Sequence, residues 1–232
     1  MQAVLDSAER DAEALVRGGC DVLLVENMGD LPYLRGHVTP ETVAAQAIAT
    51  SKVVAFGAPT GVQILAAANR EALGVAVASG AKFIRAEAFA YAHVADEGWL
   101  DASAGMLLRA RRGLDANVAV WADVQKKHAA HAVTADLALE DLCNGAAFCG
   151  ADSLIITGKE TGHATAIEDV RRAKSGGLPV VVGSGVTPEN AGELAGVADA
   201  LIVGSYLKFD GDWRKPVDQA RVKAVKAAMM AG

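Results

Sequence analysis

The chain is poor in aromatic residues and cysteine, and it contains no long apolar run. Only 5% of its 232 residues are aromatic, and its three cysteines form no CxxC pair and no Cys/His spacing suited to zinc. We interpret Cys20, Cys143 and Cys149 as small buried residues in a reduced compartment. No segment resembles a bilayer-spanning helix or a leader peptide, so we predict a cytoplasmic protein with no transmembrane segment.

Basic residues are also not in excess. The formal net charge is -6, which argues against a nucleic-acid partner, because such partners are bound through clustered Lys and Arg. The 52% of hydrophobic residues are mostly Ala, Val and Leu, which suits parallel strands covered by Ala-rich helices. The length fits a single domain over residues 1–232.

A repeating pattern of helix, glycine stop and short apolar strand runs through the chain. Thr39-Pro40-Glu41 and Thr187-Pro188-Glu189 each predict a helix start, with threonine as the N-cap and proline at the first helical position. The regular alternation favours a (β/α)8 TIM barrel. A flavodoxin-like or Rossmann sheet is the alternative, weakened because no GxGxxG follows the first strand. The predicted strands are Asp21 to Asn27, Gly61 to Ala66, Ala81 to Glu87, Val118 to Val124, Asp152 to Gly158, Pro179 to Gly185 and Ala200 to Tyr206.

Seven strands are one too few for an eight-stranded barrel. The chain opens with a predicted helix, Gln2 to Arg17, where a barrel usually has its first strand. We therefore expect either a strand upstream of this chain or a gap between the Asp21 and Ala200 strands. Exposed strand edges are normally covered or paired, so we expect something to cover this seam, and we predict a homo-oligomer.

The last two predicted strands end in glycine and serine. Gly183, Ser184, Gly185 and Val186 follow one strand, and Gly204 and Ser205 follow the next. Glycines let backbone N–H groups approach an anion, and a helix beginning just beyond adds its positive end. Such turns after the last two strands are where barrels usually hold phosphate, which predicts a small phosphorylated ligand. Two ordinary strand-to-helix turns are the alternative.

Polar residues are also predicted at the carboxyl ends of most other strands, where barrel enzymes place their catalytic groups. Alternation along a strand puts Arg85 and Glu87 on one face. The carboxylates of Glu26, Glu87 and Asp123, near cationic side chains, can act as general acid and base or hold a divalent cation such as Mg²⁺. The sequence itself names no cofactor. A structural ion pair is an equal alternative for Arg85 and Glu87. The candidate catalytic residues are Asp123, Glu87, Glu26, Lys126 and His128, and the candidate binding residues include Asn27, Gln63 and Arg85.

The segment from Thr157 to His163 contains two Thr-Gly pairs. It suits a loop that closes over a ligand, with Thr157, Gly158 and Thr161 as binding residues, or else a plain loop with a helix cap. His37, His93 and His131 lie outside these patterns, and we expect them at the surface.

Several blocks together resemble the BtpA family, also called BtpA/SgcQ, over essentially the whole chain. These blocks are Asp21 to Asp30, Gly61 to Leu65, Phe83 to Glu87, Ala122 to Ala129 and Thr157 to Gly162. The resemblance implies a TIM barrel related to phosphate-binding barrel enzymes. It also implies two quite different functions, a role in photosystem I biogenesis and a nucleoside triphosphatase activity.

The residues favour an enzyme acting on a phosphosugar or nucleotide by isomerase-like or lyase-like acid–base chemistry. The alternatives are a non-catalytic biogenesis factor for a membrane complex, the nucleoside triphosphatase that the resemblance implies, and a degenerate barrel that senses a phosphorylated ligand.

Overall fold

A parallel sheet of seven strands, curled into an incomplete barrel, forms the centre of the computed structural model, which describes residues 1–126, 128–158 and 165–231. Its order is β1-β2-β3-β6-β8-β9-β10, so the strands lie in the sheet in the order in which they follow one another along the chain. All six pairings are parallel. This confirms the predicted barrel architecture.

Each observed strand overlaps a predicted one and is shorter than expected. The seven strands are β1 (Leu23–Glu26), β2 (Thr60–Gln63), β3 (Phe83–Ala86), β6 (Ala119–Asp123), β8 (Ser153–Ile156), β9 (Val180–Val182) and β10 (Ala200–Leu201). The prediction was furthest off at β10, which was expected to reach Tyr206. Among the described residues, β10 has a neighbouring strand on one side only, and the chain then turns into the 3-10 helix η3 (Ser205–Leu207).

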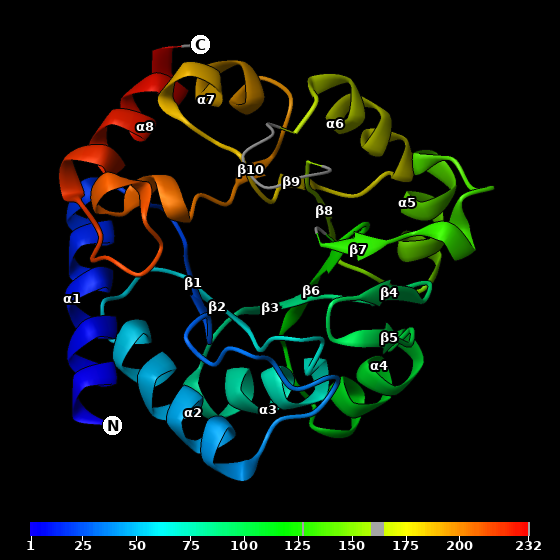
Figure 1. Cartoon of the computed structure of the whole chain (residues 1–232), viewed down its shortest axis with the longest axis horizontal. Coiled ribbons are helices and arrows are strands. Elements are labelled where there is room, and N and C mark those ends of the chain that lie inside the picture. Colours follow the sequence, from blue (N-terminus) through cyan, green and yellow to red (C-terminus); the bar gives the residue numbers. More distant parts are fainter. Residues whose placement is uncertain (127, 159–164, 232) are drawn as a thin grey trace.

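Eight α-helices of the described residues form a ring outside the strands (Figure 1). Their apolar faces cover a core of Val, Ile, Leu and Ala side chains from β2, β3, β6, β8 and β9, and Leu23 of β1 lies in a separate, smaller cluster with Ala12 and Val53. The start signals Thr39-Pro40 and Thr187-Pro188 do precede helices, as predicted. The helices are α1 (Gln2–Gly18), α2 (Pro40–Val54), α3 (Asn69–Ser79), α4 (Ala104–Gly113), α5 (Leu139–Phe148), α6 (Ile167–Ala173), α7 (Pro188–Ala195) and α8 (Gln219–Ala231).

The ring of helices closes, but the sheet does not. Helix α1 packs against both α2 and α8, whereas β1 and β10 end the sheet and are not paired with each other among the described residues (Figure 1). The expected seam is therefore present, and α1 covers it from outside. The N–H of Leu23 bonds to Pro59 on the β2 side, so the backbone N–H and C=O of Leu24 point into the seam.

A second, antiparallel sheet of three short strands follows β3 and was not predicted. It consists of β4 (His93–Ala95), β5 (Gly98–Leu100) and β7 (Ala129–Ala130), in the order β5-β4-β7. Its strands come from the β3–α4 and β6–α5 connections, so it ties together two loops at the carboxyl end of the barrel. Strands of two or three residues are too short for alternation to show in the sequence.

Candidate functional site

The carboxyl ends of β1, β3 and β6 bring an arginine and two carboxylates together. Arg85 donates from Nε to Asp123 Oδ2 at 2.8 Å and from Nη2 to Asp123 Oδ1 at 3.0 Å, and its Nη1 lies 3.4 Å from Glu26 Oε1. Burial alone would lower the pKa of Arg85, but the charges of Asp123 and Glu26 raise it above its ordinary value. This guanidinium therefore stays charged and holds both carboxylates in place.

Glu87 is the carboxyl group of the site best suited to exchange a proton. Only 4% of the residue is exposed, and its Oε2 accepts a hydrogen bond from Ala67 N–H at 2.9 Å. Burial raises the pKa of Glu87 from 4.5 to about 7, with Lys126 opposing and Asp123 adding to the effect. A general acid or base works best when its pKa lies near the working pH.

Lys126 lies between two acidic side chains. Its Nζ donates to Glu97 Oε2 at 2.8 Å and lies 3.7 Å from Glu87 Oε1. Its side chain is 11% exposed. His128, predicted beside it, is exposed and has a left-handed backbone with φ of 55°.

Asn27 and Gln63 are buried at the ends of β1 and β2. Asn27 Oδ1 accepts the Leu65 N–H at 2.8 Å, and Asn27 Nδ2 donates to Asp30 at 3.0 Å. The amide of Asn27 therefore orders the loop after β2 rather than pointing at a ligand. The backbone of Gln63 is paired in register with Glu26, which places Gln63 beside the arginine cluster.

The first glycine turn, after β9, contains a buried hydroxyl with no partner. Ser184 is 8% exposed, and its Oγ makes no hydrogen bond to any part of the chain that the structure describes. The turn is fixed by Asn190, whose side chain accepts the Thr187 N–H and donates to the Gly185 carbonyl, each at 2.8 Å. Helix α7 begins directly afterwards, so its positive end faces this turn.

Gly183 has a role that differs from the predicted one. Its N–H donates to the Ile156 carbonyl at 2.8 Å and is therefore used within the sheet. A Cβ at this position would lie 2.6 Å from Ile155 Cγ2 and 2.7 Å from Thr157 Cγ2, so close packing requires glycine here. The N–H groups left for an anion are those of Ser184, Gly185 and Val186.

The second glycine turn is open. Gly204 and Ser205 are exposed, and a Cβ on Gly204 would meet nothing within 4 Å. Leu201 of β10 is paired in register with Val182 of β9, so the two turns leave the sheet at the same edge. The residues that the sequence suggested for one anion site therefore lie on neighbouring strand ends.

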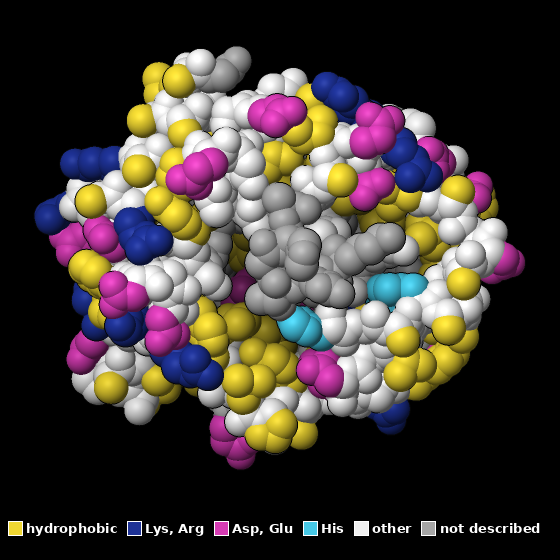
Figure 2. Space-filling view, turned by 45° about the horizontal axis from the view of Figure 1, so that its top comes forward, with side chains coloured by type: hydrophobic (Ala, Val, Ile, Leu, Met, Phe, Trp, Pro, Cys, Tyr) yellow, Lys and Arg dark blue, Asp and Glu magenta, His cyan; other side chains and the backbone are white. Residues whose placement is uncertain are grey.

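The β8 connection is only partly described. Thr157 Oγ1 donates to the Gln125 carbonyl at 2.8 Å, which links the ends of β8 and β6, and Gly158 is buried. Thr161 lies outside the described residues. The face of the molecule shown in Figure 2 is hollowed near its centre, and an acidic side chain is visible in the hollow.

Several residues of the site were not predicted from the sequence. Glu97 is one of them. Tyr33 is another, and burial together with the charges of Glu26, Glu87 and Glu97 raises the pKa of its hydroxyl. The expectation of a surface position was wrong for His93, which is 6% exposed, because β4 carries it beneath the small sheet. Burial, His131 and Lys126 lower the pKa of His93 to about 4. His37 is exposed, and His131 is half-buried.

The carboxylates do not form a ready magnesium site. Asp123 and Glu26 are bonded to Arg85, and Glu87 and Glu97 flank Lys126, so basic side chains occupy the positions that a cation would take. Within residues 1–126, 128–158 and 165–231, no group of three His, Cys, Asp or Glu side chains could hold a metal ion.

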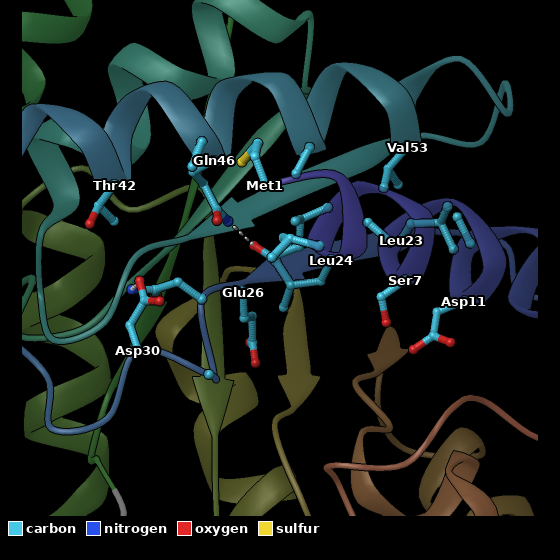
Figure 3. A pocket seen from close by; sticks show the side chains of 18 of the residues that line it. Met1, Ser7, Asp11, Leu23, Leu24, Glu26, Asp30, Thr42, Gln46 and Val53 are labelled. Carbon is cyan, nitrogen blue, oxygen red and sulfur yellow. Dashed lines mark hydrogen bonds between the residues drawn. The ribbon is translucent and has the colours of Figure 1, made fainter.

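A cavity lies at the seam. It has a volume of about 620 Å³ and is lined by α1, β1 and α2, together with Lys208. Figure 3 shows side chains from these three elements around one opening, with the Gln46 amide bonded to the carbonyl of Val25 at 3.3 Å. No helix of the described residues is long and apolar enough to cross a bilayer.

Solved structures with the same fold are TIM-barrel proteins. KGPDC from Streptococcus mutans superposes with a TM-score of 0.66 at 13% identity, over 98% of this chain and 92% of that one. Phosphoribosyl anthranilate isomerase from Thermus thermophilus gives a TM-score of 0.59 at 14% identity, over 96% and 94% of the two chains. At these identities the likeness shows the fold alone.

The family is shown by sequence. The model of the BtpA family matches residues 1–231, and the chain belongs to that family. A protein of Synechocystis named Photosystem I biogenesis protein BtpA is 36% identical over 100% of this chain and 82% of its own length. An uncharacterized protein of Caenorhabditis elegans, named as mitochondrial, is 44% identical over 96% of this chain and 83% of its own.

Proposed function

We propose that this protein is an enzyme that binds a small phosphorylated metabolite, a phosphosugar or nucleotide, at the carboxyl end of its barrel. The observation that carries the proposal is the buried Ser184 hydroxyl, which has no partner among the described residues and lies in a rigid turn before α7. A buried hydroxyl without a partner is costly, and a phosphate oxygen would satisfy it together with the N–H groups of Gly185 and Val186.

The chemistry we propose is acid–base catalysis of the isomerase or lyase type. Glu87, with a pKa of about 7, exchanges the proton, and Lys126 stabilises its ionised form. Asp123 and Glu26 are held rigid by Arg85, which suits them to orient substrate hydroxyls. The anchored phosphate would lie to one side, which leaves the rest of the substrate over the carboxylates.

A thermal-shift screen with phosphosugars and nucleotides, with and without Mg²⁺, tests the binding step. At least one phosphorylated compound should raise the melting temperature, and its dephosphorylated form should not. Gly204→Asp should abolish the shift, because it adds a negative charge at an open position, while Gly204→Asn of the same size should retain most of it. Ser184→Ala should weaken it.

Two outcomes contradict the proposal. If no phosphorylated compound stabilises the protein, the binding step is wrong. If stabilisation survives Gly204→Asp unchanged, the ligand lies elsewhere. Once a binding compound is known, Glu87→Gln should retain binding and lose turnover of that compound.

A non-catalytic assembly role is the second candidate function. The edge of β1 that faces the seam is a place where a strand of another chain can add, and the name of the Synechocystis relative refers to biogenesis. This role predicts no phosphorylated ligand at the mouth, so the same screen separates the two candidates. We further propose that the protein works in the cytoplasm. We also propose that it is a homo-oligomer, which analytical ultracentrifugation can test.

A further inference from the structure

We propose that Glu97 is a positioning residue that competes with Glu87 for the Lys126 ammonium and thereby sets the proton affinity of Glu87. Its catalytic meaning rests on the function proposed above. Glu97 comes from the unpredicted small sheet, and neither the sequence pattern nor the comparisons give it a role.

Glu97 is in an unusual place for a hairpin residue. Ala95 pairs with Gly98, so Asp96 and Glu97 form the two-residue turn between β4 and β5. Side chains at such turns normally extend into water, as Asp96 does. The Glu97 side chain is only 7% exposed and bonds to Lys126 at 2.8 Å. A buried charge is kept at such a site only when it is paired, so the pairing with Lys126 accounts for its position.

Lys126 is fixed relative to Glu97 by the backbone. Ala95 of β4 pairs with Ala129 of β7, three residues after Lys126, so the hairpin and the loop after β6 belong to one sheet. The ring of His131 also bonds to the Lys126 carbonyl at 3.0 Å. The small sheet therefore holds the ammonium between two acidic groups, 2.8 Å from Glu97 and 3.7 Å from Glu87.

This geometry divides one positive charge between two carboxylates. The nearer one, Glu97, receives the direct hydrogen bond, so Glu87 gains only part of the stabilisation that an undivided ammonium would provide. The other charged groups that act on Glu87 are Asp123, which raises its pKa, and Arg85, which lowers it. The Tyr33 hydroxyl senses the charges of both Glu87 and Glu97, and His93 and His131 lie near Lys126. Glu97 is thus the group that decides how much of the Lys126 charge reaches Glu87.

The test is a titration of the Glu87 carboxyl by NMR on protein labelled with ¹³C-glutamate and free of ligand. The Glu87 signal is identified by its loss in Glu87→Gln. Glu97→Gln keeps the side-chain shape and removes the charge, so the Lys126 ammonium is released to Glu87. The midpoint of Glu87 should fall by about one pH unit, a tenfold change in its acidity. Asp96→Asn, at the exposed position of the same turn, should leave the midpoint unchanged.

Lys126→Gln provides the complementary measurement. It should raise the Glu87 midpoint, and adding Glu97→Gln to it should have little further effect, because the proposed influence of Glu97 passes through Lys126. An unchanged midpoint in folded Glu97→Gln overturns the inference. If Glu97→Gln does not fold, an unchanged midpoint in Lys126→Gln overturns it instead.

These titrations need no substrate, so their failure is distinguishable from failure of the proposed function. If the midpoints shift as expected but no phosphorylated compound binds, the enzyme proposal is wrong and the electrostatic coupling stands. Ligand binding without midpoint shifts would do the reverse.

Discussion

Arg85 and Asp123 lie on the neighbouring strands β3 and β6 and form a two-point ion pair, with Nε to Oδ2 at 2.8 Å and Nη2 to Oδ1 at 3.0 Å. The Asp123 side chain is 1% exposed and that of Arg85 is 13% exposed. The pair also fixes Glu26 at the end of β1, so it connects strands that are not adjacent in the sheet.

Removing Arg85 should destabilise the protein strongly. Arg85→Met keeps much of the side-chain volume but leaves Asp123 buried with its charge uncompensated, which costs about 3 to 5 kcal/mol of unfolding free energy. The double variant Arg85→Met, Asp123→Leu should recover most of that loss, because no buried charge remains. Urea denaturation of both variants measures this. A single variant as stable as the wild type would mean that solvent reaches Asp123 freely.

Glu87 should make the stability of the protein depend on pH. Its pKa is about 7 in the folded protein, against 4.5 ordinarily, so between these values the folded state binds more protons than the unfolded state. Stability should therefore fall as pH rises from about 4.5 to about 7, and the contribution of this group amounts to about 3 kcal/mol.

Glu87→Gln is the matched control, because it cannot titrate. Urea denaturation at pH 5 and pH 8 should show a smaller loss of stability on going to pH 8 in the variant than in the wild type. Equal losses would show that Glu87 is ionised throughout that range and is not the proton-exchanging group.

The barrel could be predicted because its signals are local. Thr187-Pro188 marks the start of α7, and the short apolar run Val180–Val182 forms the buried strand β9. The expectation that polar groups gather at the carboxyl ends of barrel strands also placed Arg85 and Asp123 among the site candidates. Even the seam could be predicted, because it follows from a count of strands.

The small sheet and Glu97 could not be predicted in the same way. The turn residues Asp96, Glu97 and Gly98 carry a recognisable signal, but three-residue strands give no alternation to show which side of the hairpin is buried. The burial of Glu97 and His93 depends on β7, which comes from a different loop. Gly183 shows the opposite error, since a glycine read as an anion ligand is required by the packing of Ile155 and Thr157.

The two glycine turns should therefore respond differently to the same substitution. Gly183→Ala places a methyl group 2.6 Å from Ile155 Cγ2 and 2.7 Å from Thr157 Cγ2, an overpacking that should cost about 1 to 3 kcal/mol. Gly204→Ala adds a methyl group in open space, so it meets no such contact and should lower the melting temperature less than Gly183→Ala does. Thermal melts of both variants decide this. Equal effects would contradict the packing role assigned to Gly183.

Amide hydrogen exchange in β1 should reveal the open edge of the sheet. The Leu23 N–H bonds to the Pro59 carbonyl at 2.9 Å, whereas the Leu24 N–H points into the seam, where β1 has no neighbouring strand among the described residues. Both residues lie in one strand, so opening of the whole strand affects them alike, and Leu24 should exchange about 100-fold faster. Equal protection of the two amides would mean that another strand pairs with β1 in solution. If that protection disappears on dilution, the strand belongs to a second copy of the chain, as the proposed homo-oligomer requires. If it persists at every concentration, a segment of the same chain covers the seam.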